Sequence, residues 1–86
     1  MTIVPELEVL DQLLDGSRPL PLIRQVFDTN DQFLRAILAM LYAGDLRLLR
    51  DGWTEVRSWE WQTVLSNPSE WSNHRLAVTE QGSKHV

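Results

Sequence analysis

Cysteine is absent from this chain of 86 residues, and histidine occurs only twice. Without cysteine there can be no disulfide, no thiolate metal site and no cysteine nucleophile. Because small secreted domains usually depend on disulfides, we expect an intracellular, cytoplasmic location. A chain of this length has room for one domain, residues 1–86, with a small core.

Long hydrophobic runs are missing as well. The longest, from Ala36 to Ala43, has eight residues, whereas a helix needs about 20 apolar residues to cross a bilayer. The N-terminal residues MTIVPELE have no basic region ahead of an apolar stretch, so we expect no signal peptide. The sequence therefore predicts a protein that does not use a membrane as a partner.

Basic residues are few. Eight Lys and Arg face twelve Asp and Glu, which gives a net charge of −4. This balance repels polyanions at long range. Charge therefore disfavours DNA as a partner, although the basic side chains lean towards the C-terminal half of the chain.

Residues suited to catalysis form no recognisable constellation. His74 lies beside a predicted strand and His85 next to the C-terminus, and neither has the neighbours of a metal ligand or a general base. The serines show no nucleophile-elbow pattern, and no glycine-rich loop could hold a phosphate. We expect no enzyme activity, no cofactor, no metal and no small-molecule substrate.

Helical periodicity is what the first half does contain. Leucines recur at three-to-four spacing over residues 5–15, which predicts a helix that ends at Gly16. Its acidic side chains are interpreted as a solvated face. Pro19 and Pro21 require an extended piece, and a second helix is predicted over residues 21–27.

A third helix is predicted over residues 30–43. Thr29 followed by Gln32 has the spacing of a capping box at its start. Within residues 33–43 only Arg35 is charged. We therefore expect this helix to be enclosed on most of its circumference and to form the centre of the core.

Strands are predicted in the second half, over residues 45–50 and 75–79. The dipeptide Asp51-Gly52 is typical of a tight hairpin, so the chain after it is expected to pair back on the first strand. Residues 53–73 are interpreted as a tryptophan-rich helical insertion, and the polar residues 80–86 are expected to fray. The result is an α+β fold, with three helices and a small antiparallel sheet.

Two fragments in this arrangement resemble the winged-helix superfamily. Leu41-Tyr-Ala-Gly-Asp-Leu46 is similar to the junction where its third helix stops at glycine and enters the first wing strand. Leu76-Ala-Val-Thr-Glu-Gln-Gly82 resembles its closing Leu-x-x-Thr-x-x-Gly signature. The order helix, extended piece, helix, helix, hairpin is also similar. The resemblance implies a winged-helix-like domain with the insertion in its wing.

The resemblance also implies candidates for DNA binding. In DNA-binding relatives the start of the third helix reads bases and the wing carries an arginine to the minor groove. The matching positions of the third helix here are Asn30, Asp31, Gln32 and Arg35. A local basic patch on the wing could also form from Arg47, Arg50, Arg57 and Arg75. Specific binders commonly neutralise about 6–10 phosphates, and eight scattered basic residues could hardly converge on one duplex. A DNA-binding transcriptional regulator is therefore the alternative interpretation.

Four tryptophans within nineteen residues carry the preferred interpretation: Trp53, Trp59, Trp61 and Trp71. Such a concentration suits a surface that binds a protein partner. The same residues could instead form a satellite core that closes the insertion over the sheet. Both interpretations hold if one tryptophan ring is exposed while the others are packed. We expect a module that works by homodimerisation or by docking to a larger protein, with at least one tryptophan partly exposed.

Overall fold

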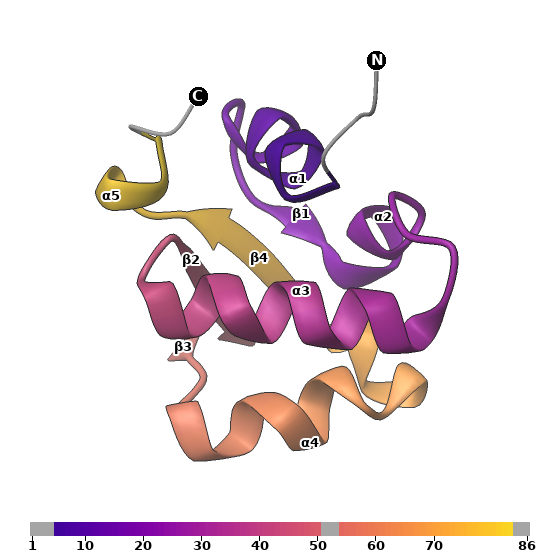
Figure 1. Ribbon diagram of the computed structural model, residues 1–86. Helices are drawn as coiled ribbons and strands as arrows, with labels where there is room; N and C mark the ends of the chain where they lie inside the picture. Colours follow the sequence, from indigo (N-terminus) through magenta and orange to yellow (C-terminus); the bar gives the residue numbers. More distant parts are fainter. Residues whose placement is uncertain (1–4, 51–53, 84–86) are drawn as a thin grey trace.

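The computed structural model describes residues 5–50 and 54–83, and this part of the chain has an α+β fold (Figure 1). The three predicted helices and the two predicted strands are present, although several ends differ. The elements are α1 (Pro5–Leu13), β1 (Arg18–Pro19), α2 (Leu20–Arg24), α3 (Asn30–Ala43), β2 (Leu46–Arg50), β3 (Thr54–Glu55), the 3-10 helix η1 (Ser58–Glu60), α4 (Trp61–Leu65), the 3-10 helix η2 (Pro68–Asn73), β4 (His74–Val78) and α5 (Glu80–Ser83).

The strands form a four-stranded antiparallel sheet in the order β1-β4-β2-β3. Its centre is the pair β2 and β4, with Leu46 opposite Val78 at one end and Arg50 opposite His74 at the other. Strand β3 pairs with β2, as expected of a hairpin. The predicted turn at residues 51 and 52 lies outside the described residues.

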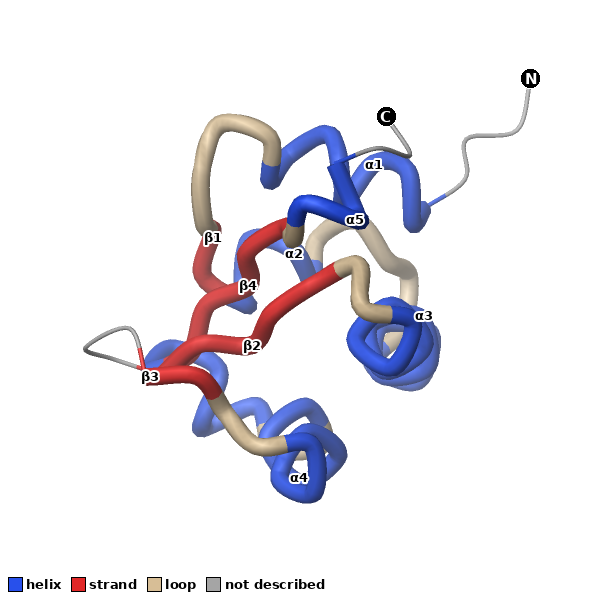
Figure 2. The backbone as a smooth tube through the Cα atoms, turned by 90° about the vertical axis from the view of Figure 1, so that its left-hand side faces the viewer, coloured by secondary structure: helices blue, strands red, loops and turns tan. Residues whose placement is uncertain are grey.

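The core fills the space between one face of the sheet and the helices. Figure 2 shows α3 on one side of β2 and β4, and Figure 1 shows α3 lying between α1 and α2 on one flank and α4 on the other. The largest fully buried side chains are Phe33, Leu13, Leu20, Ile23, Ile37, Leu48, Leu65, Leu76 and Val9. The insertion therefore contributes Leu65 to the same core that the first three helices form.

Helix α3 is enclosed on most of its circumference over residues 33–43, as the sequence predicts. Its inward side is buried at Phe33, Ile37, Met40 and Leu41. Its outward side is exposed, and this side includes the apolar residues Ala39 and Tyr42 as well as Arg35. Leu34, Ala36 and Leu38 are partly buried against the core, so the exposed side of residues 33–43 is a narrow stripe.

Both ends of α3 are fixed by local contacts. The Thr29 Oγ1 atom accepts a hydrogen bond of 3.1 Å from the Gln32 backbone N–H, as predicted. The Gln32 Oε1 atom accepts from the Asp28 N–H at 3.2 Å, one residue before the donor that a capping box uses. At the other end, Gly44 adopts the left-handed conformation, with φ of 86°.

The two fragments that resemble the winged-helix pattern lie against each other. The Thr79 hydroxyl donates to the Gly44 carbonyl at 2.6 Å and accepts from the Gly82 N–H at 3.0 Å. The Gln81 amide donates to the Ala43 carbonyl at 2.7 Å. These hydrogen bonds attach residues 79–82 to the C-terminal end of α3.

Helix α5 corrects the prediction that residues 80–86 fray, because residues 80–83 are helical. Its first turn is held by the Thr79 hydroxyl and by the Gln81 side chain, whose partners lie about forty residues earlier in the chain. Residues 84–86 lie outside the described part. The other differences are smaller: α1 ends at Leu13 rather than at residue 15, and α2 runs from Leu20 to Arg24 rather than from 21 to 27.

Candidate functional site

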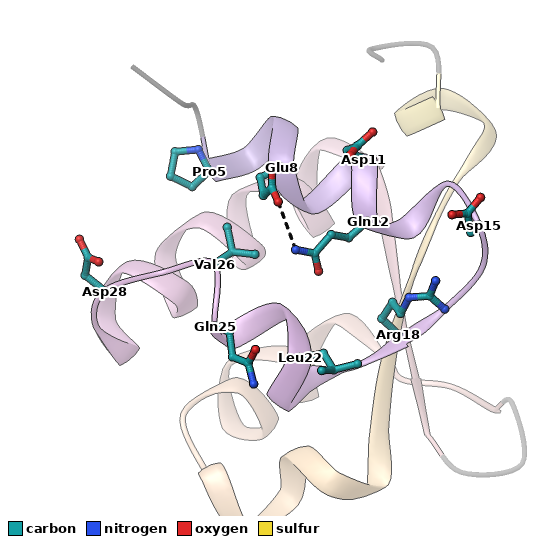
Figure 3. Close-up of a pocket in the computed structure, with 10 residues that line it drawn as sticks. All are labelled: Pro5, Glu8, Asp11, Gln12, Asp15, Arg18, Leu22, Gln25, Val26 and Asp28. Carbon is teal, nitrogen blue, oxygen red and sulfur yellow. Dashed lines mark hydrogen bonds between the residues drawn. The ribbon is translucent and has the colours of Figure 1, made fainter. Parts of the chain in front are cut away.

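A cavity of about 870 Å³ lies between α1 and α2 (Figure 3). Acidic residues line it, among them Glu8, Asp11 and Asp28. In Figure 3 the carboxylates of Asp11 and Asp28 point away from the middle of the cavity, and Glu8 accepts a hydrogen bond of 3.3 Å from Gln12. Within residues 5–50 and 54–83, no three His, Cys, Asp or Glu side chains are grouped to hold a metal ion. The acidic face therefore borders this open cavity without converging on a site.

His74 is buried at the start of β4. Its Nδ1 atom lies 2.6 Å from the Glu70 carbonyl oxygen, and its Nε2 atom lies 3.5 Å from the Arg50 Nε atom. Both ring nitrogens thus hold β4 against η2 and β2. The other histidine, at position 85, lies outside the described residues.

Trp71 belongs to the core. Its ring meets Phe33 edge-to-face, with 5.0 Å between the centroids, and its indole N–H donates to the Leu65 carbonyl at 3.2 Å. The satellite-core interpretation therefore holds for this residue, which joins η2 and α4 to α3.

Trp61 is more exposed to solvent than Trp71, and Trp59 is more exposed than Trp61. Trp61 is half-buried, donates to the Val56 carbonyl at 3.0 Å and packs edge-to-face on Tyr42 with 5.1 Å between the centroids. Trp59 is 76% exposed, with the Arg57 guanidinium 5.9 Å from its ring centroid. The prediction that at least one tryptophan is exposed is confirmed. Trp53 lies outside the described residues.

Tyr42 and Leu7 extend this exposed aromatic surface across the helices. Tyr42 is 70% exposed and Leu7 on α1 is 49% exposed. Between α1 and α3 lies a groove of about 460 Å³, whose apolar lining comprises Leu7, Leu10, Ala39, Met40 and Ala43. We call the series of exposed and half-buried apolar residues that runs from α1 over α3 to α4 and η1 the apolar strip. Its members are Leu7, Ala39, Ala43, Tyr42, Trp61 and Trp59.

The sequence analysis did not select Leu7 and Tyr42 for this surface. A signal for Tyr42 was present, because it follows Asp31 and Arg35 at helical spacing and so shares their solvent-facing side. No comparable local signal marks Leu7, because it belongs to a leucine series in which Leu10 and Leu13 are buried and Leu14 is exposed.

The DNA-binding candidates on α3 are tied into local contacts. The Asn30 Oδ1 atom accepts from the Arg24 Nε atom at 2.5 Å, and Arg35 forms an ion pair of 3.0 Å with Asp31. Gln32 takes part in the cap described above. Each of these side chains would have to leave an intramolecular partner to read a base.

The four candidate arginines of the wing are not gathered with the start of α3. Arg50 pairs with Glu60 at 3.2 Å, and Arg57 lies over Trp59. Arg47 and Arg75 lie on the face of the sheet opposite to buried Leu48 and Leu76, since neighbouring strand residues alternate between faces. Figure 2 shows α3 on the other side of these strands.

The longest helix of the described residues is α3, with 14 residues. Among residues 5–50 and 54–83, no helix combines the length and the apolar character needed to traverse a lipid bilayer.

Comparison with models of protein families, with curated proteins and with solved structures finds no match for this chain.

Proposed function

We propose that this chain is a non-catalytic, winged-helix-like module that acts by contact with a protein, through the apolar strip. The exposed Trp59 is the observation that carries the proposal. The winged-helix part is supported by the order α1, β1, α2, α3, β2 and β3 and by the Thr79 contacts that join the two fragments of the pattern.

The physical argument rests on where the aromatic side chains lie. Trp59 and Tyr42 both lie outside the hydrophobic core, and the Tyr42 ring packs on Trp61, which is partly buried against the core. Tryptophan, tyrosine and arginine are the residues that most often dominate the binding energy of protein interfaces. An indole and a phenol on one surface, with a guanidinium beside the indole, therefore suit contact with a protein better than contact with water.

Site-specific photocrosslinking tests the proposal. A photoreactive phenylalanine analogue is placed at position 59 in one variant and at position 22 in another, in cells that express the chain. Leu22 is the matched control, because it is 45% exposed on α2 and lies outside the apolar strip. We expect a discrete crosslinked protein species from position 59 and none from position 22. Equal crosslinking from both positions, or none from position 59, would refute the proposed surface.

DNA binding is the second candidate, favoured by Arg47 and Arg75 on one face of the sheet. Titration into a labelled mixed-sequence duplex at low salt separates it from the first. We expect no change in fluorescence anisotropy at tens of micromolar protein, since the net charge is −4 and phosphate contacts dominate the affinity for DNA. Binding that weakens steeply with salt and with Arg47→Ala would favour DNA instead.

A further inference from the structure

The groove between α1 and α3 has the properties of a receptor for one large apolar side chain. Its volume of about 460 Å³ falls in the range of pockets that bind ligands. Leu10 and Met40 are buried beneath it, and exposed Leu7 stands at its side. Glu6, the neighbour of Leu7, also lines it and adds a carboxylate.

Trp59 at the opposite end of the apolar strip has the complementary properties. Its ring is exposed, and the neighbouring basic side chain is Arg57. Within the described residues, neither Arg57 nor Glu6 belongs to an ion pair. An apolar ring with a positive charge beside it would thus meet an apolar groove with a negative charge beside it.

The order of the elements lets two copies make this contact twice. Helix α3 lies between α1 and α4 (Figure 1), so a two-fold axis that runs along α3 in the plane of the interface would place η1 of each copy over α1 of the other. The residues exposed on α3 towards the groove are Ala39 and Ala43, one turn apart. Their small side chains leave room in the groove for an incoming ring.

We propose that the partner bound by the apolar strip is a second copy of this chain. In the symmetric dimer, Trp59 of each copy enters the groove between α1 and α3 of the other, and Arg57 of each lies opposite the partner's Glu6. This inference rests on the proposed function and names the protein that the strip contacts.

Sedimentation velocity on the purified full chain tests the dimer. We expect the wild-type chain to sediment as a dimer that dissociates on dilution, and both Trp59→Ala and Leu7→Asp to sediment as monomers with unchanged far-ultraviolet circular dichroism. Leu22→Asp is the matched control and is expected to remain dimeric. A wild-type chain that stays monomeric at its highest attainable concentration would overturn the inference.

A charge exchange tests the predicted pairing itself. Arg57→Glu and Glu6→Arg are each expected to weaken dimerisation about tenfold or more, because each places like charges against each other twice. An equimolar mixture of the two variants is expected to recover the wild-type affinity as a heterodimer, in which both contacts again join opposite charges. Weakening without recovery in the mixture would refute the arrangement.

The outcomes separate the inference from the proposed function. If the purified chain is monomeric while position 59 crosslinks to a different protein, the dimer is refuted and the apolar strip remains a protein-binding surface. If the chain is monomeric and position 59 gives no crosslink, both are refuted.

Discussion

Replacing Trp71 with alanine is expected to destabilise the fold by about 3–5 kcal/mol, the usual cost of removing a large buried aromatic side chain. The change leaves a cavity beside Phe33 and removes the donor that satisfies the Leu65 carbonyl. It also removes the side chain that attaches η2 to α3. Urea unfolding followed by circular dichroism measures the loss.

Two further variants make this prediction specific to burial. Trp59→Ala removes a side chain of the same type that is 76% exposed, so at a dilution at which the wild-type chain is monomeric we expect a change within about 0.5 kcal/mol. Trp71→Phe keeps part of the ring contact and is expected to fall between the two alanine variants. A cost for Trp71→Ala no larger than that for Trp59→Ala would contradict the assignment of Trp71 to the core.

Replacing Gly82 with alanine has the second largest expected effect. A Cβ atom at this position would lie 2.2 Å from the Asp45 carbonyl oxygen and 2.9 Å from the Val78 Cγ2 atom. The first neighbour is backbone at the junction of α3 and β2, which cannot move without disturbing the Thr79 contacts. We therefore expect a loss of about 1–3 kcal/mol, the range for overpacking, with the result near its upper end.

The control for Gly82→Ala is Gln81→Ala. This variant also changes a residue of α5, but it adds no atom and removes only exposed hydrogen bonds, from the Gln81 amide to the Ala43 carbonyl and to Asp45. We therefore expect it to cost about 1 kcal/mol or less. Thermal unfolding of both variants gives the comparison. If Gly82→Ala costs no more than Gln81→Ala, the close approach of α5 to the Asp45 backbone does not stabilise the fold.

Gly82 also supplies a physical reason for the last position of the Leu-x-x-Thr-x-x-Gly fragment. Leu76 is fully buried, Thr79 bridges Gly44 and Gly82, and Gly82 lies against the Asp45 carbonyl. Each position of the fragment therefore has its own contact. The glycine is needed because a side chain there would collide with the backbone between α3 and β2.

The sequence predicted best where the signals were local. Helix α3 has its predicted bounds because Thr29 and Gly44 fix its ends through neighbouring atoms. Helix α2 ends three residues before its predicted end, at Arg24, whose guanidinium donates to the Phe27 carbonyl at 2.6 Å and to Asn30. Apolar periodicity alone could not reveal a turn held by a side chain.

Contacts between distant segments were beyond the sequence analysis. The first turn of α5 depends on Gln81 reaching the end of α3, and nothing in the polar composition of residues 80–83 indicates that partner. The tryptophans show the same limit at the candidate site. Trp71 is buried because it meets Phe33, whereas Trp61 meets exposed Tyr42, so their different burial follows from partners about twenty to forty residues away.

The outer strands of the sheet have a consequence for self-assembly. Strands β1 and β3 are each two residues long, and β1 contains Pro19, which has no N–H to donate. Short edge strands, and edge strands that contain proline, offer few backbone groups to which an incoming strand could hydrogen-bond. Natural proteins use such edge strands to prevent aggregation. Growth of the sheet into a fibre is therefore discouraged. A two-fold dimer that forms through helical side chains would use the same surface of both copies, so no third copy could add to it.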